Sequence, residues 1–306
     1  MMKITKPSEV LAVASASIER MTDHVVDVIE IRRPTSVMYA LQLTKIVSKL
    51  SPLLGNLFEF RVVDTLNQDL GNTANGIWIR QDPGFPDARF LSEDFPMFNI
   101  GVEIKAWFPF ATEITGRFRD SERIFADNLI NVAIIAWLPE FVFWGKPKVL
   151  KTLIVSGKSI AETRDNHYHK PPHYLVVEPE DTADRTANLQ QTNTAGYVFQ
   201  DERGKNRNLY IQAEKEIEAL GEGFLKYSSG REYQSEMKRL QGKYPYRLDT
   251  NYAKIDRIQH RDIERFKTSV EQMRYMGKQV SEWKRLMSLD LNNPALIRAI
   301  EELMSR

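Results

Sequence analysis

The chain has 306 residues, and its 42 lysines and arginines nearly balance its 41 aspartates and glutamates, giving a net charge of +1. With 42% hydrophobic residues it can bury a substantial core. It contains no cysteine, which excludes disulfides, thiolate nucleophiles and cysteine-ligated zinc or iron-sulfur sites. No apolar stretch of about 20 residues is present, so we expect a cytoplasmic protein without membrane contact.

The first 50 residues have the apolar rhythm of helices. Ser8–Ile29 begins with a serine and a nearby glutamate, a pattern that is typical of helix N-termini. Pro34–Leu50 follows as a second predicted helix. We therefore expect a helical N-terminal region over residues 1–50.

The next part of the chain predicts one helix and then several short strands. Leu53–Val63 mixes apolar and polar residues as a helix does, and it contains Glu59. The elements expected after it are a strand at Gly76–Arg80, a hairpin of Ala88–Ser92 with a strand that begins at Met97, a helix at Asp120–Asn128, and a buried strand at Asn131–Trp137. This order indicates an α/β fold.

One strand of this region carries charged residues on a single face. From Ile100 to Trp107 the residues alternate, so that Glu103 and Lys105 share the face opposite to the apolar one. Asp87 lies 16 residues before Glu103, a separation that fits two short strands and a turn. Because glycine and proline precede Asp87, a bend can place its carboxylate at a strand end. We expect Asp87, Glu103 and Lys105 to meet at one edge.

These residue types suit metal-assisted hydrolysis of a phosphodiester. Magnesium takes oxygen ligands, so Asp87, Glu103, the carbonyl of Ile104 and a phosphate oxygen form a plausible set. Such a metal polarises the phosphate and lowers the pKa of a bound water. Lys105 is able to orient the attacking water or to offset charge on the phosphate.

Pro86, Asp87, Glu103 and Lys105 together resemble the motif of PD-(D/E)xK nucleases, a superfamily best known from type II restriction endonucleases. The resemblance implies a restriction-endonuclease-like core, a central mixed β-sheet flanked by helices, with additional helical N- and C-terminal regions. It also implies Glu59 as a third acid and metal ligand. The implied cofactor is Mg²⁺, for which Mn²⁺ can substitute, and the implied partners are double-stranded DNA and a second copy of the chain in a homodimer.

Two polar stretches beyond the core are candidates for contact with DNA. The first comprises Ser156–Ser159 and a predicted loop at Arg164–Lys170, and the second is a predicted loop at Arg203–Asn208. The candidate residues are Lys158, Arg164, Asn166, His169, Lys170, Arg203, Lys205 and Arg207. No Walker loop or dinucleotide-binding glycine fingerprint is present, so we expect no nucleotide cofactor.

The remaining chain predicts charged helices. They are expected at Glu214–Leu225, Arg231–Leu240, Asp262–Met276 and Pro294–Met304. The expected division is therefore a helical region over 1–50, a nuclease core with its DNA-contacting loops over 51–212, and a mainly helical C-terminal region over 213–306, with all three able to form one domain.

Three functions agree with this pattern. The leading one is a type II restriction-like endonuclease that hydrolyses specific sites in double-stranded DNA with Mg²⁺. A repair or recombination nuclease that acts on structured DNA keeps the same core and chemistry. A non-catalytic DNA-binding protein, in which the motif arises by accident, is the third.

Overall fold

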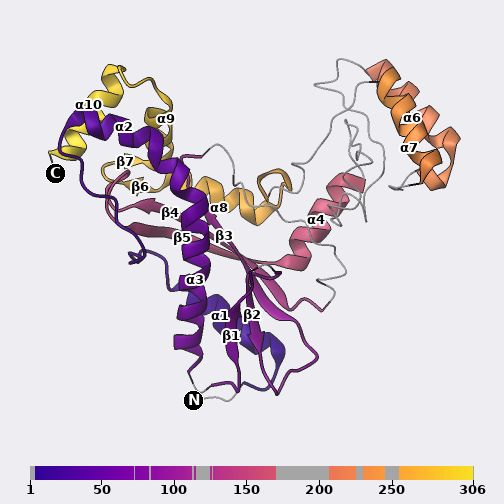
Figure 1. Cartoon of the computed structure of the whole chain (residues 1–306), viewed down its shortest axis with the longest axis horizontal. Helices are drawn as coiled ribbons and strands as arrows, with labels where there is room; N and C mark the ends of the chain where they lie inside the picture. Colours follow the sequence, from indigo (N-terminus) through magenta and orange to yellow (C-terminus); the bar gives the residue numbers. More distant parts are fainter. Residues whose placement is uncertain are drawn as a thin grey trace. The chain divides into compact units, whose positions relative to one another are not determined.

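A computed structural model describes residues 4–71, 73–82, 84–111, 114, 125, 127–169, 207–224, 230–244 and 255–305 (Figure 1). The chain forms two compact units. The first comprises Met1–Gly116, Asp127–Gly157 and Arg261–Arg306, and the second comprises Arg117–Ala126 and Lys158–His260. This grouping differs from the expected ranges 1–50, 51–212 and 213–306, because both ends of the chain pack into the unit that holds the sheet.

A five-stranded mixed sheet forms the centre of the first unit. Its strands are β1 (Ile77–Arg80), β2 (Ala88–Leu91), β3 (Ile100–Trp107), β4 (Ile130–Pro139) and β5 (Pro147–Ser156). They lie in the order β1-β2-β3-β4-β5, and every neighbouring pair is antiparallel except β3 and β4. The predicted α/β class with a mixed central sheet is confirmed, as is the strand over Asn131–Trp137. The predicted hairpin is present as β2 and β3, but its second strand begins at Ile100 and not at Met97.

Helices cover both faces of this sheet. On one face lie α1 (Pro7–Glu19) and α3 (Ser51–Leu70), where Asn131 donates to Ser15 at 3.2 Å and the rings of Phe58 and Trp137 are 6.2 Å apart. On the other face lies α8 (Arg261–Gln272), whose Phe266 ring is 6.0 Å from that of Trp107. Strand β4 is therefore buried on both sides, which explains its nearly unbroken apolar sequence.

The N-terminal helices differ in part from the prediction. The predicted helix Ser8–Ile29 ends at Glu19, because the chain beyond it runs beside β5. There the backbone N–H of Asp23 donates to the carbonyl of Val149 at 2.8 Å. The second predicted helix is confirmed as α2 (Val37–Ile46), which continues through the 3₁₀ turn η1 (Val47–Leu50) into α3. Ser36 caps α2 by accepting from the backbone of Tyr39.

The C-terminal part of the first unit contains elements that the sequence pattern did not predict. The predicted helix Asp262–Met276 stops at Gln272, and the hairpin β6 (Arg274–Tyr275) and β7 (Lys278–Gln279) follows. Its turn requires positive φ angles, which Met276 (47°) and Gly277 (86°) adopt. Then come α9 (Val280–Ser288), which was not predicted, and α10 (Pro294–Met304), whose predicted bounds are confirmed.

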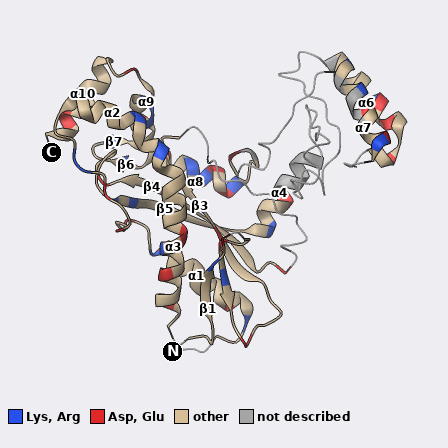
Figure 2. Ribbon diagram, viewed as in Figure 1, with Lys and Arg blue, Asp and Glu red and all other residues tan. Residues whose placement is uncertain are grey.

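The second unit is helical in the part that the structure describes. It contains α4 (Gly157–His169), α6 (Arg207–Leu220), η5 (Glu222–Phe224), α7 (Arg231–Lys243) and η6 (Ile255–Arg257). Figure 2 shows charges of both signs along α6 and α7. Glu216 of α6 accepts hydrogen bonds from Arg239 (2.9 Å), Lys243 and Tyr244 (2.6 Å), and these bonds lower the pKa of Glu216 to about 2. The two helices are thus joined by an ion-pair cluster.

The loop predicted at Arg164–Lys170 is wrong where the structure describes it, because Gly157–His169 is helical. Ile160 and Ala161 are fully buried and give this segment an apolar side, which stabilises the helix. Likewise Arg207 and Asn208 begin α6 rather than end a loop. Most of the predicted helix Asp120–Asn128, and Arg203–Asn206, lie outside the described residues.

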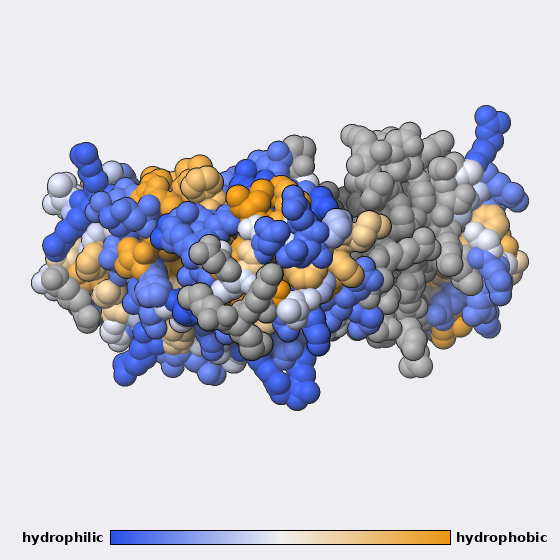
Figure 3. Space-filling view, turned by 90° about the horizontal axis from the view of Figure 1, so that it is seen from below, coloured by the Kyte–Doolittle hydropathy of each residue, from blue (hydrophilic) through white to orange (hydrophobic). Residues whose placement is uncertain are grey.

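On the face shown in Figure 3, the coloured residues are mainly hydrophilic, with apolar ones between them. Within the described part of the chain, no helix combines the length and the apolar character that crossing a membrane requires.

Candidate active site

The end of the β2–β3 ladder brings the predicted site residues together. Ala88 pairs with Val102, so the same register places Asp87 opposite Glu103. The backbone N–H of Asp87 donates to Oε2 of Glu103 at 3.2 Å, and the N–H of Ile104 donates to Oδ2 of Asp87 at 2.7 Å. Each carboxylate is thus fixed by the backbone of the strand opposite.

Lys105 completes this group. Its Nζ lies 3.5 Å from Oδ2 of Asp87 and donates to Oε1 of Glu103. The side chains of Lys105 and Asp87 are each 15% exposed and that of Glu103 is 9% exposed. All three side chains are therefore in mutual contact. They are more enclosed than the sheet edge at which the alternation of β3 predicts them.

Burial controls the protonation of this group. It raises the pKa of Glu103 to about 7, since the charge of Asp87 adds to the effect of burial and the ammonium of Lys105 only partly offsets both. Burial lowers the pKa of Lys105, but the charges of Glu103 and Asp87 outweigh it, so the net shift is upward. Lys105 is consequently a cation here, which favours charge stabilisation over proton acceptance.

Glu59 reaches the site from α3 and is held by an arginine of β1. Arg80 donates from Nε (3.0 Å) and Nη2 (2.9 Å) to Oε2 of Glu59, and it also contacts Asn56 (3.2 Å) and Asp82 (3.0 Å). Burial raises the pKa of Glu59, the charge of Asp87 raises it further, and Arg80 opposes both. Glu59 is therefore close enough to Asp87 to interact with it, although its carboxylate is bound to Arg80.

A glycine in β3 sets the position of the segment that carries Asp87. A Cβ on Gly101 would lie 2.1 Å from Cγ of Pro86 and 2.8 Å from the carbonyl oxygen of Ala88. Gln81, the residue after β1, fixes the same segment. Its side chain donates to the carbonyl of Pro86 at 2.9 Å, and its backbone N–H donates to the carbonyl of Asp87 at 2.8 Å. The close contact between Pro86 and Gly101 thus fixes the position of Asp87.

Sequence reasoning missed three residues that shape this site, namely Arg80, Gly101 and Arg89. Arg89 follows Asp87 by two residues in β2 and so lies on the same face. Its Nε is buried and has no hydrogen-bond partner among the described residues. On that face the cross-strand pair Ile77 and Leu91 is exposed, so the sheet edge beside Arg89 is open. Alternation along β2 was the signal that could have identified it.

The residues predicted to contact DNA are not part of this group. Lys158, Arg164, Asn166 and His169 belong to α4 and Arg207 to α6. Lys170, Arg203 and Lys205 lie outside the described residues.

The acids do not form a ready-made metal cage. In the described part of the chain, no group of three or more His, Asp or Glu side chains is arranged to hold a metal ion. Asp87 and Glu103 supply two carboxylates side by side, and the carbonyl of Ile104 faces the same side as its N–H, beyond the last paired residue of β2. Two carboxylates and one carbonyl are a partial set of oxygen donors of the kind that Mg²⁺ uses.

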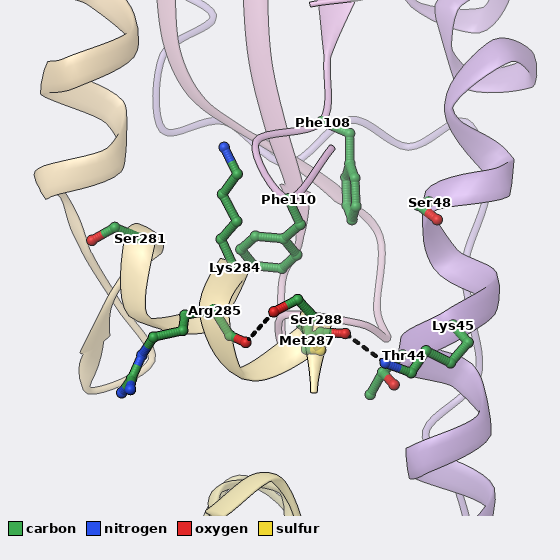
Figure 4. A pocket seen from close by; sticks show the side chains of 10 residues that line it. All are labelled: Thr44, Lys45, Ser48, Phe108, Phe110, Ser281, Lys284, Arg285, Met287 and Ser288. Atoms are coloured by element: carbon green, nitrogen blue, oxygen red, sulfur yellow. Dashed lines mark hydrogen bonds between the residues drawn. The ribbon is translucent and has the colours of Figure 1, made fainter. Parts of the chain in front are cut away.

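A cavity of about 460 Å³ lies elsewhere in the first unit (Figure 4). It is bounded by α2 and η1, by α9, and by Phe108 and Phe110 after β3. Lys45 spans from α2 to the end of α9, donating to the carbonyls of Met287 (2.7 Å) and Leu289 (2.6 Å). None of the three motif side chains lines this cavity.

The chain matches no model of a protein family, no curated protein and no solved structure with which it was compared.

Proposed function

We propose that this chain is a magnesium-dependent endonuclease of restriction type that hydrolyses phosphodiester bonds in double-stranded DNA. The observation that supports the proposal is the mutual contact of Asp87, Glu103 and Lys105 at the end of the β2–β3 ladder. Two acids and a cation gathered from separate segments match the residue types that such hydrolysis needs.

Asp87 and Glu103 are the residues that would hold the metal, with the carbonyl of Ile104 as a third donor. Their carboxylates are adjacent. Burial, together with the charge of Asp87, raises the pKa of Glu103 to about 7, and a bound cation would favour its charged form. Glu59 adds a further carboxylate nearby and is the remaining candidate ligand. When bound, Mg²⁺ would polarise the phosphate and lower the pKa of a water molecule.

Lys105 is the cationic side chain of the site. Held between Asp87 and Glu103, its ammonium can donate to the attacking water and to the nonbridging phosphate oxygens, which gain charge during in-line displacement. Arg80 fixes Glu59 and so keeps the third acid in place. Arg89, on the open face beside Asp87, is suited to bind a neighbouring phosphate of the DNA strand.

Plasmid cleavage tests the proposal. Wild-type protein should convert supercoiled DNA to linear fragments in Mg²⁺ or Mn²⁺. Asp87→Asn and Lys105→Ala should each reduce the rate by at least about 1,000-fold, since each removes a charge on which the chemistry depends. Asp64→Asn, on the exposed side of α3, is the matched control and should cut at the wild-type rate.

The pattern of products separates the proposal from its rivals. Defined fragments from an intact plasmid support a site-specific enzyme. Cleavage confined to branched or damaged DNA would instead identify a repair nuclease with the same site. Binding of DNA without cleavage in either metal, or undiminished cutting by Asp87→Asn, would refute the assignment.

A further inference from the structure

The continuous helical segment formed by α2, η1 and α3 exposes a row of large apolar side chains. Tyr39, Ile46, Leu53 and Phe60 follow one another at intervals of seven residues and are 49%, 47%, 51% and 66% exposed. Met38, beside Tyr39, is 72% exposed. We call these five residues the apolar stripe.

The stripe is separate from the face by which these helices join the core. Residues that directly follow its members, Ala40, Val47 and Leu54, are buried against the rest of the unit. Because successive residues are about 100° apart around a helix, the stripe lies beside this buried seam and not in it. Removing the stripe side chains therefore need not disturb the core.

Three leucines lie between the stripe residues in the sequence. Leu43, Leu50 and Leu57 lie four residues after Tyr39, Ile46 and Leu53 and are half-buried. The alternating spacing of four and three is the heptad pattern by which a helix packs against another helix. From Tyr39 to Phe60 every residue belongs to α2, η1 or α3, and the direction of the chain changes between α2 and α3 (Figure 1).

We propose that the apolar stripe is the surface on which a second copy of this chain docks through twofold symmetry. The order of residue types is the same from either end of the stripe, since Tyr39 and Phe60 are aromatic and the two residues between them are aliphatic. Two copies can therefore pair like with like whether their helices run parallel or antiparallel. A twofold interface needs such a self-complementary patch.

Charge and area agree with this occupant. Within 36–60, a range that the structure describes completely, Lys49 is the only exposed charged residue, so two copies meet with little repulsion. If each of the five side chains contributes roughly 100 Å², about half of the area of a large apolar side chain, two copies bury roughly 1,000 Å². That is the size at which specific interfaces begin.

Sedimentation of the full chain over a range of concentrations tests the proposal. The wild type should be a dimer. Leu53→Glu should raise the dimer dissociation constant by at least about 100-fold, because each twofold pairing buries two copies of the new charge. Met97→Glu, which alters an exposed methionine between β2 and β3, is the matched control and should stay dimeric.

The absence of cysteine allows a second, independent measurement. Leu53→Cys should form a disulfide dimer on oxidation if the paired helices run parallel, and Leu50→Cys should do so if they run antiparallel, because Leu50 is near the middle of the stripe. Either result supports the proposal, and the thermal unfolding of the reduced variants shows whether they are folded.

Three outcomes would overturn the proposal. They are a wild type that stays monomeric at all concentrations, a dimer that persists unchanged in Leu53→Glu, and a monomer in which Cys-directed labelling of Leu53→Cys is blocked. The last would show that another part of the chain covers the stripe. The oligomeric state is measured without DNA or metal, so its outcome is independent of the proposed nuclease activity.

Discussion

Folding changes the protonation of Glu103. Burial and the charge of Asp87 raise its pKa from 4.5 to about 7. Between these two values the folded protein holds a proton that the unfolded chain releases, so this carboxyl makes the protein less stable as the pH rises through that interval. The direction is the reverse of the usual acid in an ion pair.

Glu103→Gln should remove this dependence. The free energy of unfolding of the variant, relative to wild type, should rise as the pH increases from about 4.5 through about 7. Urea denaturation in the presence of EDTA, which keeps both proteins free of metal, measures the difference. A difference that is constant over this interval, or that falls, would contradict the raised pKa.

Under the proposed function we expect Arg89 to bind DNA, because alternation along β2 places it on the face that carries Asp87. The buried Nε of Arg89 has no partner among the described residues. Arg89→Gln should weaken DNA binding and slow cleavage by about 10- to 100-fold, the effect of losing a charged hydrogen bond, while Mg²⁺ binding stays unchanged.

Arg61→Gln is the control for this substitution. Arg61 pairs with Asp64 on the exposed side of α3 at 2.6 Å, so its removal alters the net charge equally without touching the sheet edge. Filter binding at several salt concentrations compares the two variants. Equal loss in both would mean that Arg89 acts only through net charge.

At the scale of elements, the contact between Pro86 and Gly101 joins β3 to the segment that carries Asp87. Gly101→Ala places a Cβ 2.1 Å from Cγ of Pro86, so Pro86 or β3 must move. We expect a loss of about 1–3 kcal/mol in stability and a large loss of cleavage, because Asp87 shifts with its neighbour. Thermal unfolding and plasmid cleavage measure both effects.

Gly55→Ala is the matched substitution in α3. A Cβ there meets nothing within 4 Å, so alanine should stabilise the helix by about 0.5–1 kcal/mol. If Gly101→Ala were as well tolerated as Gly55→Ala, the contact with Pro86 would not be what places Asp87.

The sequence allowed the strands that carry the motif to be predicted, because burial on one or two faces leaves a regular pattern. β3 alternates and β4 is almost wholly apolar, so both were predicted close to their bounds. The hairpin β6–β7 was missed because its turn uses Met276 with a positive φ, which few residues other than glycine and asparagine adopt. The second half of α4 was predicted as a loop at Arg164–Lys170 because polar residues in this helix outnumber the buried pair Ile160 and Ala161.

The sequence predicted which residues form the site, but it did not predict how deeply they are buried. Spacing and alternation brought Asp87, Glu103 and Lys105 together, since a register fixes which residues face one another. Glu59 is held beside the site by Arg80, which lies 21 residues away in the sequence and binds its carboxylate. Contacts of this kind leave no periodic signal, and neither does the fit of Pro86 against Gly101.

At the scale of the whole molecule, the last 46 residues belong to the unit that holds the sheet, since Arg261–Arg306 is grouped with it. Tyr275 makes one of the connections. Its hydroxyl lies 2.9 Å from the carbonyl oxygen of Pro139 and 3.0 Å from that of Glu140, at the end of β4. Its own carbonyl accepts from the indole N–H of Trp283 in α9 at 2.7 Å. Tyr275 thus joins the C-terminal helices to the central sheet.

Tyr275→Phe should therefore destabilise the entire first unit and not only its C-terminal end. Removing the hydroxyl removes the donor that the buried carbonyl of Pro139 and the part-buried carbonyl of Glu140 share, which should lower the free energy of unfolding by about 1–2 kcal/mol. Because Tyr275 connects the C-terminal helices to β4, tryptophan fluorescence and far-UV circular dichroism should shift together to a lower midpoint. Ser288→Ala, which removes an exposed hydroxyl at the end of α9, should leave the midpoint unchanged. Separate transitions in Tyr275→Phe would instead show that residues 261–306 unfold independently of the sheet.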